Sequence, residues 1–169
     1  MILARSISLK RKQVTLLIYG IVFFLLSNLP ANAQITVTTA QNLSFGAFFQ
    51  GDIGGTVTIS YDGSRSATGG VILANIGGFT FLPAIFEVEA PVGTVIAIQN
   101  GPDVTLTGNN GGSMTLSVGS SSTGSPFTTT VAPPGRTQVR IGATLTVGSP
   151  AANPSGTYNG SLSVTFIQQ

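Results

Sequence analysis

From residue 34 onward, apolar side chains recur at every second position, and this pattern restricts the fold more than any other feature. The period is clearest where Phe86, Val88 and Ala90 alternate with Glu87 and Glu89. Such alternation puts the apolar residues of a strand on one face of a sheet. No stretch of a dozen residues shows a helical stripe without Gly, Pro or β-branched breakers, so no significant helix is expected. The expected strands include 35–40, 56–61, 86–90, 105–107, 114–118, 137–147 and 157–167.

Turn-forming residues separate these segments. Asp62-Gly63 suits a tight hairpin, because glycine readily adopts the positive φ that such turns require. About nine to eleven short strands at this spacing predict an all-β fold, a two-sheet antiparallel sandwich. An up-and-down barrel is the alternative architecture. Gly142, inside 139–147, is expected to mark a bulge or a strand that changes sheets.

The first 33 residues differ from the rest of the chain. Four basic residues and no acids precede or flank an uncharged apolar run over 14–29, and Pro30 then leads into Ala31-Asn32-Ala33. A basic start, an apolar run and a small-x-small site predict a helical signal peptide over 1–33, cleaved between Ala33 and Gln34. The single β-sandwich domain would then be 34–169. An uncleaved membrane anchor is the alternative, because 13–33 is uncharged and nearly long enough to span a bilayer.

A cleaved leader predicts export to the periplasm, the cell surface or the medium, with membrane contact only through the signal peptide before cleavage. Residues 34–169 carry three arginines and five acids, a net charge of −2, which offers no basic stripe for nucleic acid. They contain no His, Cys or Lys. These absences exclude Ser-His-Asp and Cys-His catalysis, Schiff-base chemistry, zinc sites built from His or Cys, and disulfides. We therefore expect no catalytic residues, no cofactor and no metal.

Two features of 34–169 could still support chemistry or ligand binding. Glu87 and Glu89 share one strand face, which suits the pair of carboxylates that a glycosidase uses, but Phe86 and Val88 should face the core and leave both glutamates in water. Phe79 and Phe81 also share a face and could form an apolar patch, although core packing explains them more simply. A hydrolase using the two glutamates is thus only an alternative to a non-enzymatic protein.

Several blocks of sequence, taken in order, resemble the bacterial domain-of-unknown-function family 4402. The resemblance covers essentially all of 34–169 and implies an exported bacterial protein, without bringing any catalytic residues. The blocks are LSFG at 43–46, GGTVTI at 54–59, DGSRSATGGV at 62–71, AIFEV at 84–88, IGATLTV at 141–147 and GTYNGSLSVTF at 156–166.

The last block is also similar to the C-terminal strand of chaperone–usher fimbrial subunits and spore-coat U-like proteins. Gly156 and Tyr158 begin an alternating strand whose Leu162, Val164 and Phe166 share one face, while Gln168 stands where fimbrial subunits usually have Tyr. This resemblance implies an immunoglobulin-like, pilin-like sandwich. It also implies possible partners: a fimbrial chaperone and usher, or further copies in a homopolymer.

The function expected from the sequence is that of an exported, non-enzymatic surface or fimbrial-type structural protein. Such a protein acts through β-strand pairing, in which a partner's extended segment pairs with an exposed sheet edge. The candidate pairing residues are Ile35, Val37, Gly156, Tyr158, Leu162, Val164 and Phe166. The segment 34–40 is either a donor or the first strand of a complete domain. The alternative function is a self-contained secreted sandwich that binds a glycan or another envelope component.

Overall fold

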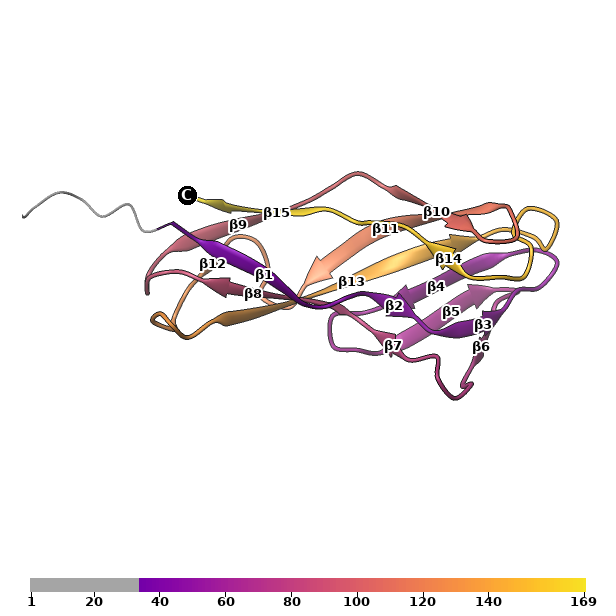
Figure 1. Ribbon diagram of the computed structural model, residues 1–169, viewed down its shortest axis with the longest axis horizontal. Helices are drawn as coiled ribbons and strands as arrows, with labels where there is room; N and C mark the ends of the chain where they lie inside the picture. The colour runs from indigo at the N-terminus through magenta and orange to yellow at the C-terminus, as the bar shows by residue number, and fades with distance from the viewer. Residues whose placement is uncertain (1–33) are drawn as a thin grey trace, which may run out of the picture. The chain divides into compact units, whose positions relative to one another are not determined.

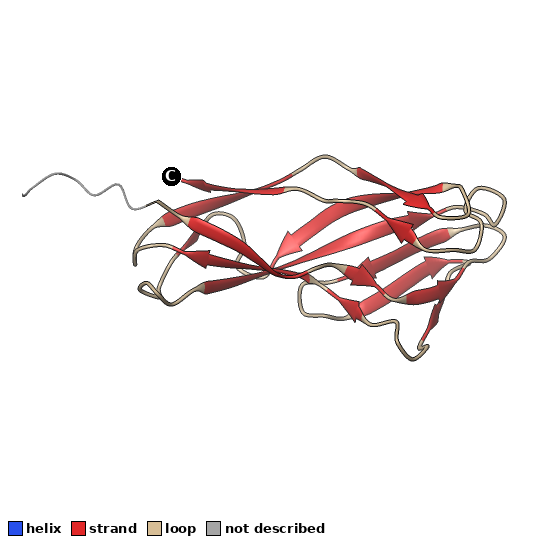
Figure 2. Ribbon diagram, viewed as in Figure 1, coloured by secondary structure: helices blue, strands red, loops and turns tan. Residues whose placement is uncertain are grey.

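The computed structural model describes residues 34–169, which consist of strands joined by turns and loops (Figure 2). The signal peptide predicted over 1–33, with Ala31 and Ala33, lies outside the described residues, and exposed Gln34 is the first residue within them. Residues 34–169 contain no helix, and hence none that could cross a membrane. The prediction of an all-β domain is confirmed.

The fifteen strands within residues 34–169 are short, with two exceptions of nine and eleven residues. In chain order they are β1 (Thr36–Gln41), β2 (Ser44–Phe45), β3 (Ala47–Phe49), β4 (Gly55–Ile59), β5 (Arg65–Gly69), β6 (Ile72–Ala74), β7 (Phe81–Leu82), β8 (Ala84–Glu89), β9 (Val95–Asn100), β10 (Val104–Gly108), β11 (Ser113–Ser121), β12 (Phe127–Thr128), β13 (Thr137–Val147), β14 (Tyr158–Asn159) and β15 (Val164–Gln168).

Every strand pair in the described part of the chain is antiparallel, and β13 lies inside the largest sheet, where it pairs with three strands (Figure 1). That sheet runs β1-β8-β13-β11-β10-β14, with β4 and β5 added beside the second half of β13. A second sheet has the order β12-β9-β15, and two short pairs, β2–β7 and β3–β6, complete the fold. This arrangement agrees with the predicted antiparallel sandwich.

Two hydrophobic clusters fill the interior. The first, here called the β9 core, joins β8 and β13 of the large sheet to β9 and β12 through residues such as Val88, Ile96 and Ile141. The second, the β4 core, joins β4, β10, β11 and β13 and includes Val57 and Leu145. Because the chain has no cysteine, burial of these apolar residues supplies the main driving force for folding.

Gly142 lies where β13 exchanges one neighbour for another. On one edge of β13, β8 pairs up to Ile141 and β4 pairs from Ala143 onward. A Cβ on Gly142 would come within 3.0 Å of the backbone of Ser60 and Tyr61, so only glycine allows the end of β4 to approach this closely. Because β8 and β4 belong to the same sheet, β13 stays in one sheet, and the expectation that it changes sheets at Gly142 is wrong. The register shift at this level lies on the facing strand β11.

The predicted Asp62-Gly63 hairpin joins β4 to β5. Gly63 has a φ of 88°, and Ser60 donates its N–H to the carbonyl of Ser64 at 2.9 Å. The Asp62 carboxylate accepts the N–H of Ser64 at 2.8 Å. Hydrogen bonds from the side chain and backbone of Ser64 lower the pKa of Asp62 from its usual value. The turn chemistry read from the sequence is confirmed.

Candidate strand-pairing edge

The C-terminal segment differs from the single strand expected over 157–167. Its first part, β14, pairs with β10 in the large sheet, whereas β15 pairs with β9 in the second sheet. Between them, Gly160 lies against β10, where an added Cβ would contact Leu106. The segment thus leaves one sheet before it joins the other, and glycine permits the close passage over β10.

The predicted alternation nevertheless continues through the whole segment. Tyr158, Leu162, Val164 and Phe166 are half-buried, while their neighbours in the segment are exposed. Tyr158 and Leu162 pack against the β4 core, and Val164 and Phe166 pack against the β9 core. Figure 1 shows this yellow segment following the length of the sandwich. Its inward face therefore helps to cover both cores.

The start of this segment is anchored within the domain. The Tyr158 hydroxyl donates to the carbonyl of Pro154 at 2.7 Å, and the backbone N–H of Thr157 donates to the Asn109 side chain at 2.9 Å. A Cβ on Gly156 would also collide with the Asn109 side chain. The bond from Thr157 to Asn109, together with the Tyr158 hydroxyl 3.3 Å from the carbonyl of Gly111, holds the segment to the β10–β11 turn, and Gly156 leaves room for the Asn109 side chain. In this structure these residues all contact other parts of their own domain.

The main chain of β15 offers a free edge. Gly101 donates its N–H to the carbonyl of Ser163, and Gln169 donates its N–H to the carbonyl of Val95, at 2.9 and 3.0 Å. In an antiparallel pair, hydrogen-bonded residues alternate with residues whose main chain points away. Odd-numbered residues of this segment therefore face β9. The N–H and C=O groups of Val164, Phe166 and Gln168 point to the other side, where β15 pairs with no described strand.

The expected donor segment belongs to the domain itself in this structure. β1 pairs with β8, with Val37 opposite Val88, and Ile35 packs against the β9 core. Five of the six residues of β1 are exposed, and Val37 is 36% exposed. β1 is also an edge strand of its sheet. The segment is thus the first strand of the domain, and it is held mainly by its pairing with β8.

The free edges of β1 and β15 flank the same aromatic pair. Phe86 lies on β8 opposite Thr39 of β1, and its ring centroid is 5.5 Å from that of Phe166 on β15. The two rings tilt at 58° and close the interior between the sheets. Neither β1 nor β15 contains Lys, Arg, Asp, Glu or Pro, the residues that commonly protect a sheet edge from pairing. An added strand at β15 would meet no repelling charge on either edge strand.

The two glutamates of β8 both form ion pairs with Arg136, whereas the sequence predicted that they would lie free in water. Arg136 donates to Glu87 at 3.0 Å and to Glu89 at 3.3 Å, and the two carboxylate side chains are about one-third exposed. The bonds to Glu87 and then Glu89 raise the pKa of Arg136. This arrangement ties β8 to the chain before β13. Within 34–169, no group of three or more His, Cys, Asp or Glu side chains could hold a metal ion.

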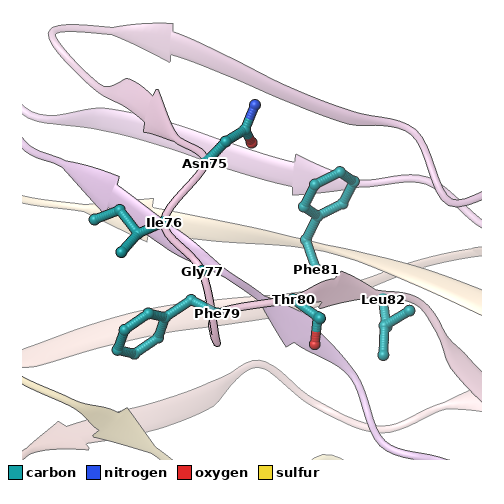
Figure 3. Close-up of a pocket in the computed structure, with 7 residues that line it drawn as sticks. All are labelled: Asn75, Ile76, Gly77, Phe79, Thr80, Phe81 and Leu82. Atoms are coloured by element: carbon teal, nitrogen blue, oxygen red, sulfur yellow. The ribbon is translucent and has the colours of Figure 1, made fainter.

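Phe79 and Phe81 lie at the surface, which corrects the simpler expectation that they pack in the core. Phe79 is 59% exposed, and both line a shallow hollow of about 390 Å³ together with Ile76 and Leu82 (Figure 3). Sequence alternation predicted that the two residues share a strand face, but Phe79 precedes β7, and the two rings point to different sides in Figure 3.

Fold and edges together define an antiparallel β-sandwich whose C-terminal strand has one unpaired edge. The chain belongs to the family described as Domain of unknown function (DUF4402), whose sequence model matches residues 35–167. No curated protein and no solved structure shows a significant match to the chain. The resemblance to this family is confirmed, whereas the likeness to fimbrial subunits and spore-coat U-like proteins stays a prediction.

Proposed function

We propose that this chain is an exported, non-enzymatic structural protein of the bacterial surface, of fimbrial type, which acts by pairing its C-terminal strand with a partner strand. The observation that carries the proposal is the free edge of β15, where Val164, Phe166 and Gln168 offer unpaired main-chain groups. An exposed edge is a template for another chain, and this one carries none of the charges that usually prevent such pairing.

The chemistry of the edge defines the segment that it would accept. Each main-chain hydrogen bond contributes only about 1 kcal/mol net, so pairing alone gives modest affinity. Further stabilisation comes from apolar side chains of the partner that face inward over Phe86 and Phe166. An extended segment with alternating apolar residues and no proline fits best, because every second side chain would contact the rings.

Two donors are consistent with this edge. One is a second copy, which would supply Ile35 and Val37. Cleavage after Ala33 would leave just two residues ahead of β1, too few to form a separate donor segment. The β1 strand of that copy would therefore have to leave β8 before it could pair elsewhere. The other is a separate chaperone or subunit with its own extended segment. The low burial of β1 favours exchange between copies, and hence a homopolymer.

A proline substitution tests the free edge directly. The N–H of Gln168 points away from β9, so Gln168→Pro removes one group from the free edge and none from the β9–β15 ladder. We expect heat-sensitive ladders of the wild-type protein in unheated electrophoresis, and at least a tenfold loss of ladder for Gln168→Pro with a nearly unchanged melting temperature.

Ile167→Pro is the matched control for this substitution. It removes a bond to β9 and leaves a β9 carbonyl without its donor, which should cost about 1–3 kcal/mol of stability. Ladders that persist unchanged in Gln168→Pro would reject β15 as the acceptor. A wild-type protein that stays a soluble monomer when expressed with its neighbouring secretion genes would reject the structural role. The self-contained sandwich that binds a glycan or another envelope component would then be the better explanation.

A further inference from the structure

The dipeptide Asn-Gly occurs three times in the sequence, at 100–101, 110–111 and 159–160. In this dipeptide the asparagine side chain can react with the main chain that follows it, because glycine has no side chain to hinder the approach and its backbone rotates freely. All three asparagines are exposed. The three sites therefore share the same local chemistry, and only the fold distinguishes them.

The first dipeptide is held at both reacting groups. The reaction needs a free N–H on the glycine and a side-chain amide that can turn toward it. Gly101 donates its N–H to the carbonyl of Ser163 at 2.9 Å. The side-chain amide of Asn100 donates to the carbonyl of Gly119 at 3.0 Å. Both bonds must break before these two groups can meet.

The second dipeptide lies in the turn between β10 and β11 and is held in the same way. Gly111 donates its N–H to the carbonyl of Gly108 at 3.1 Å, which closes the turn. The side-chain amide of Asn110 donates to the carbonyl of Ser155 at 2.8 Å. Here too, both reacting groups are engaged in the folded chain.

The third dipeptide, Asn159-Gly160, has neither restraint. Asn109 donates its N–H to the carbonyl of Thr157, and Asn159 lies opposite Thr107 two residues further along the same pair. Since bonded residues alternate in an antiparallel pair, the main chain of Asn159 faces β10 and that of Gly160 points away. Among residues 34–169, no hydrogen-bond partner is found for the Asn159 side chain or for the Gly160 N–H.

The chain around this third dipeptide can also rearrange locally. The strand β14 has only two residues, and residues 160–163 after it belong to no strand. Short and exposed segments with few main-chain bonds open far more often than paired strands in a core. Such an opening lets the peptide unit between Asn159 and Gly160 rotate, which brings the glycine nitrogen to the side-chain carbonyl.

We propose that Asn159 is a site of spontaneous modification, where the folded chain converts its own asparagine into aspartate and isoaspartate, while the fold protects Asn100 and Asn110. The Gly160 nitrogen loses its proton to solvent and bonds to Cγ of Asn159. The bond from Cγ to Nδ2 breaks, and this nitrogen takes a proton from solvent and leaves as ammonia. Water then opens the five-membered ring at either carbonyl. The net change is the gain of one water and the loss of one ammonia.

The position of Asn159 gives this modification a structural consequence. In isoaspartate the main chain runs through Cβ, so it is longer by one carbon atom, and a carboxylate replaces the neutral amide. Tyr158 before the site and Leu162 after it both pack against the β4 core. The longer main chain disturbs the alternation that keeps both side chains on the inward face. The modification therefore loosens the C-terminal segment where it passes from the large sheet to the second sheet (Figure 1).

Peptide mapping by mass spectrometry tests the site in folded protein and in protein unfolded with guanidinium chloride, incubated at the same mildly alkaline pH. In the folded protein, Asn159 should convert at least tenfold faster than Asn100 and Asn110, whose bonded groups react only after local opening. In the unfolded protein the three rates should become similar, because the dipeptide is the same. Asn159→Gln should suppress the fast conversion, because the longer side chain closes the ring much more slowly.

Asn159→Asp is the matched control for the structural consequence, because it adds the charge without lengthening the main chain. The isoaspartate form, separated by ion exchange, should exchange its amide hydrogens over 158–163 at least tenfold faster than Asn159→Asp. Equal exchange in the two would refute the loosening. Equal conversion of all three asparagines in the folded protein, or faster conversion at Asn100 or Asn110, would overturn the assignment to Asn159. A folded protein in which Asn159 stays intact while the unfolded chain converts would overturn it as well.

Discussion

Arg65 shows how one side chain organises several elements. It lies on β5 and donates to carbonyls of three other short strands, and these strands contribute few residues to the buried cores. Carbonyls that lose a charged donor in a half-buried position are left without their hydrogen-bond partner. The planar fork of arginine reaches several acceptors at once, whereas a lysine ammonium acts as a point charge. Arg65 thus links β5 to three short strands through their main chain.

We predict that Arg65→Lys lowers the free energy of unfolding by about 1–3 kcal/mol, because lysine serves fewer of the three carbonyls. Urea denaturation measures the change. Arg140→Lys is the matched control, because Arg140 is exposed and its side chain bonds only Gln138, so its effect should stay within about 0.5 kcal/mol. Equal effects for the two substitutions would show that Arg65 has no organising role.

For single residues, the sequence predicted which face of a strand a side chain occupies better than it predicted which residue that side chain contacts. The alternation of β8 correctly placed Val88 in the core and the two glutamates on the outer face. It gave no sign that Arg136, some fifty residues later, would bind both carboxylates. Period-two alternation states which side of a strand is apolar, and the partner on the polar side depends on which strands become neighbours.

Among the elements, β13 determines how the large sheet is built. It pairs with β8, β4 and β11, so each core contains several of its residues. Gly142 sits at the junction between β8 and β4, where the backbone of Ser60 and Tyr61 comes close. The sequence predicted a special role for this glycine, and the structure shows that its role is to leave space for a neighbouring chain.

Gly142→Ala should therefore destabilise the protein by about 1–3 kcal/mol, because its methyl group forces the end of β4 away from β13. Gly77→Ala provides the comparison, since an added Cβ there meets nothing within 4 Å. Thermal unfolding followed by circular dichroism measures both. A stable Gly142→Ala protein would mean that the β4–β5 hairpin can shift at little cost.

The C-terminal segment shows what the sequence could not predict about a strand, namely which sheet each part of it joins. Its alternation correctly predicted the inward face, yet the strand is divided between two sheets. The reason is that apolar side chains cover a core equally well whether or not their main chain is paired. Gly160 and the serines around it were compatible with a continuous strand, and only the position of β10 and β9 decides where pairing stops.

For the whole molecule, the most consequential feature is that the sandwich ends on an open strand. The β9 core is covered on one side by β1 and β8 and on the other by β9 and β15, and nothing among residues 34–169 pairs with the outer edge of β15. The sequence predicted the fold class from alternation and turns, and the family from a resemblance in the order of its sequence blocks. It left open whether the domain was complete, because completeness depends on which strands face each other.

Strand pairing at β15 joins one copy to an extended segment and gives directional growth if the donor belongs to another copy.

Hydrogen exchange at single-residue resolution, on assembled and unassembled protein, tests strand pairing most directly. The N–H groups of Thr165 and Ile167 already bond β9, so they should be protected in both states. The N–H groups of Val164, Phe166 and Gln168 face outward, and we predict that assembly slows their exchange at least tenfold. Unchanged exchange at these three positions in assembled material would contradict pairing at β15.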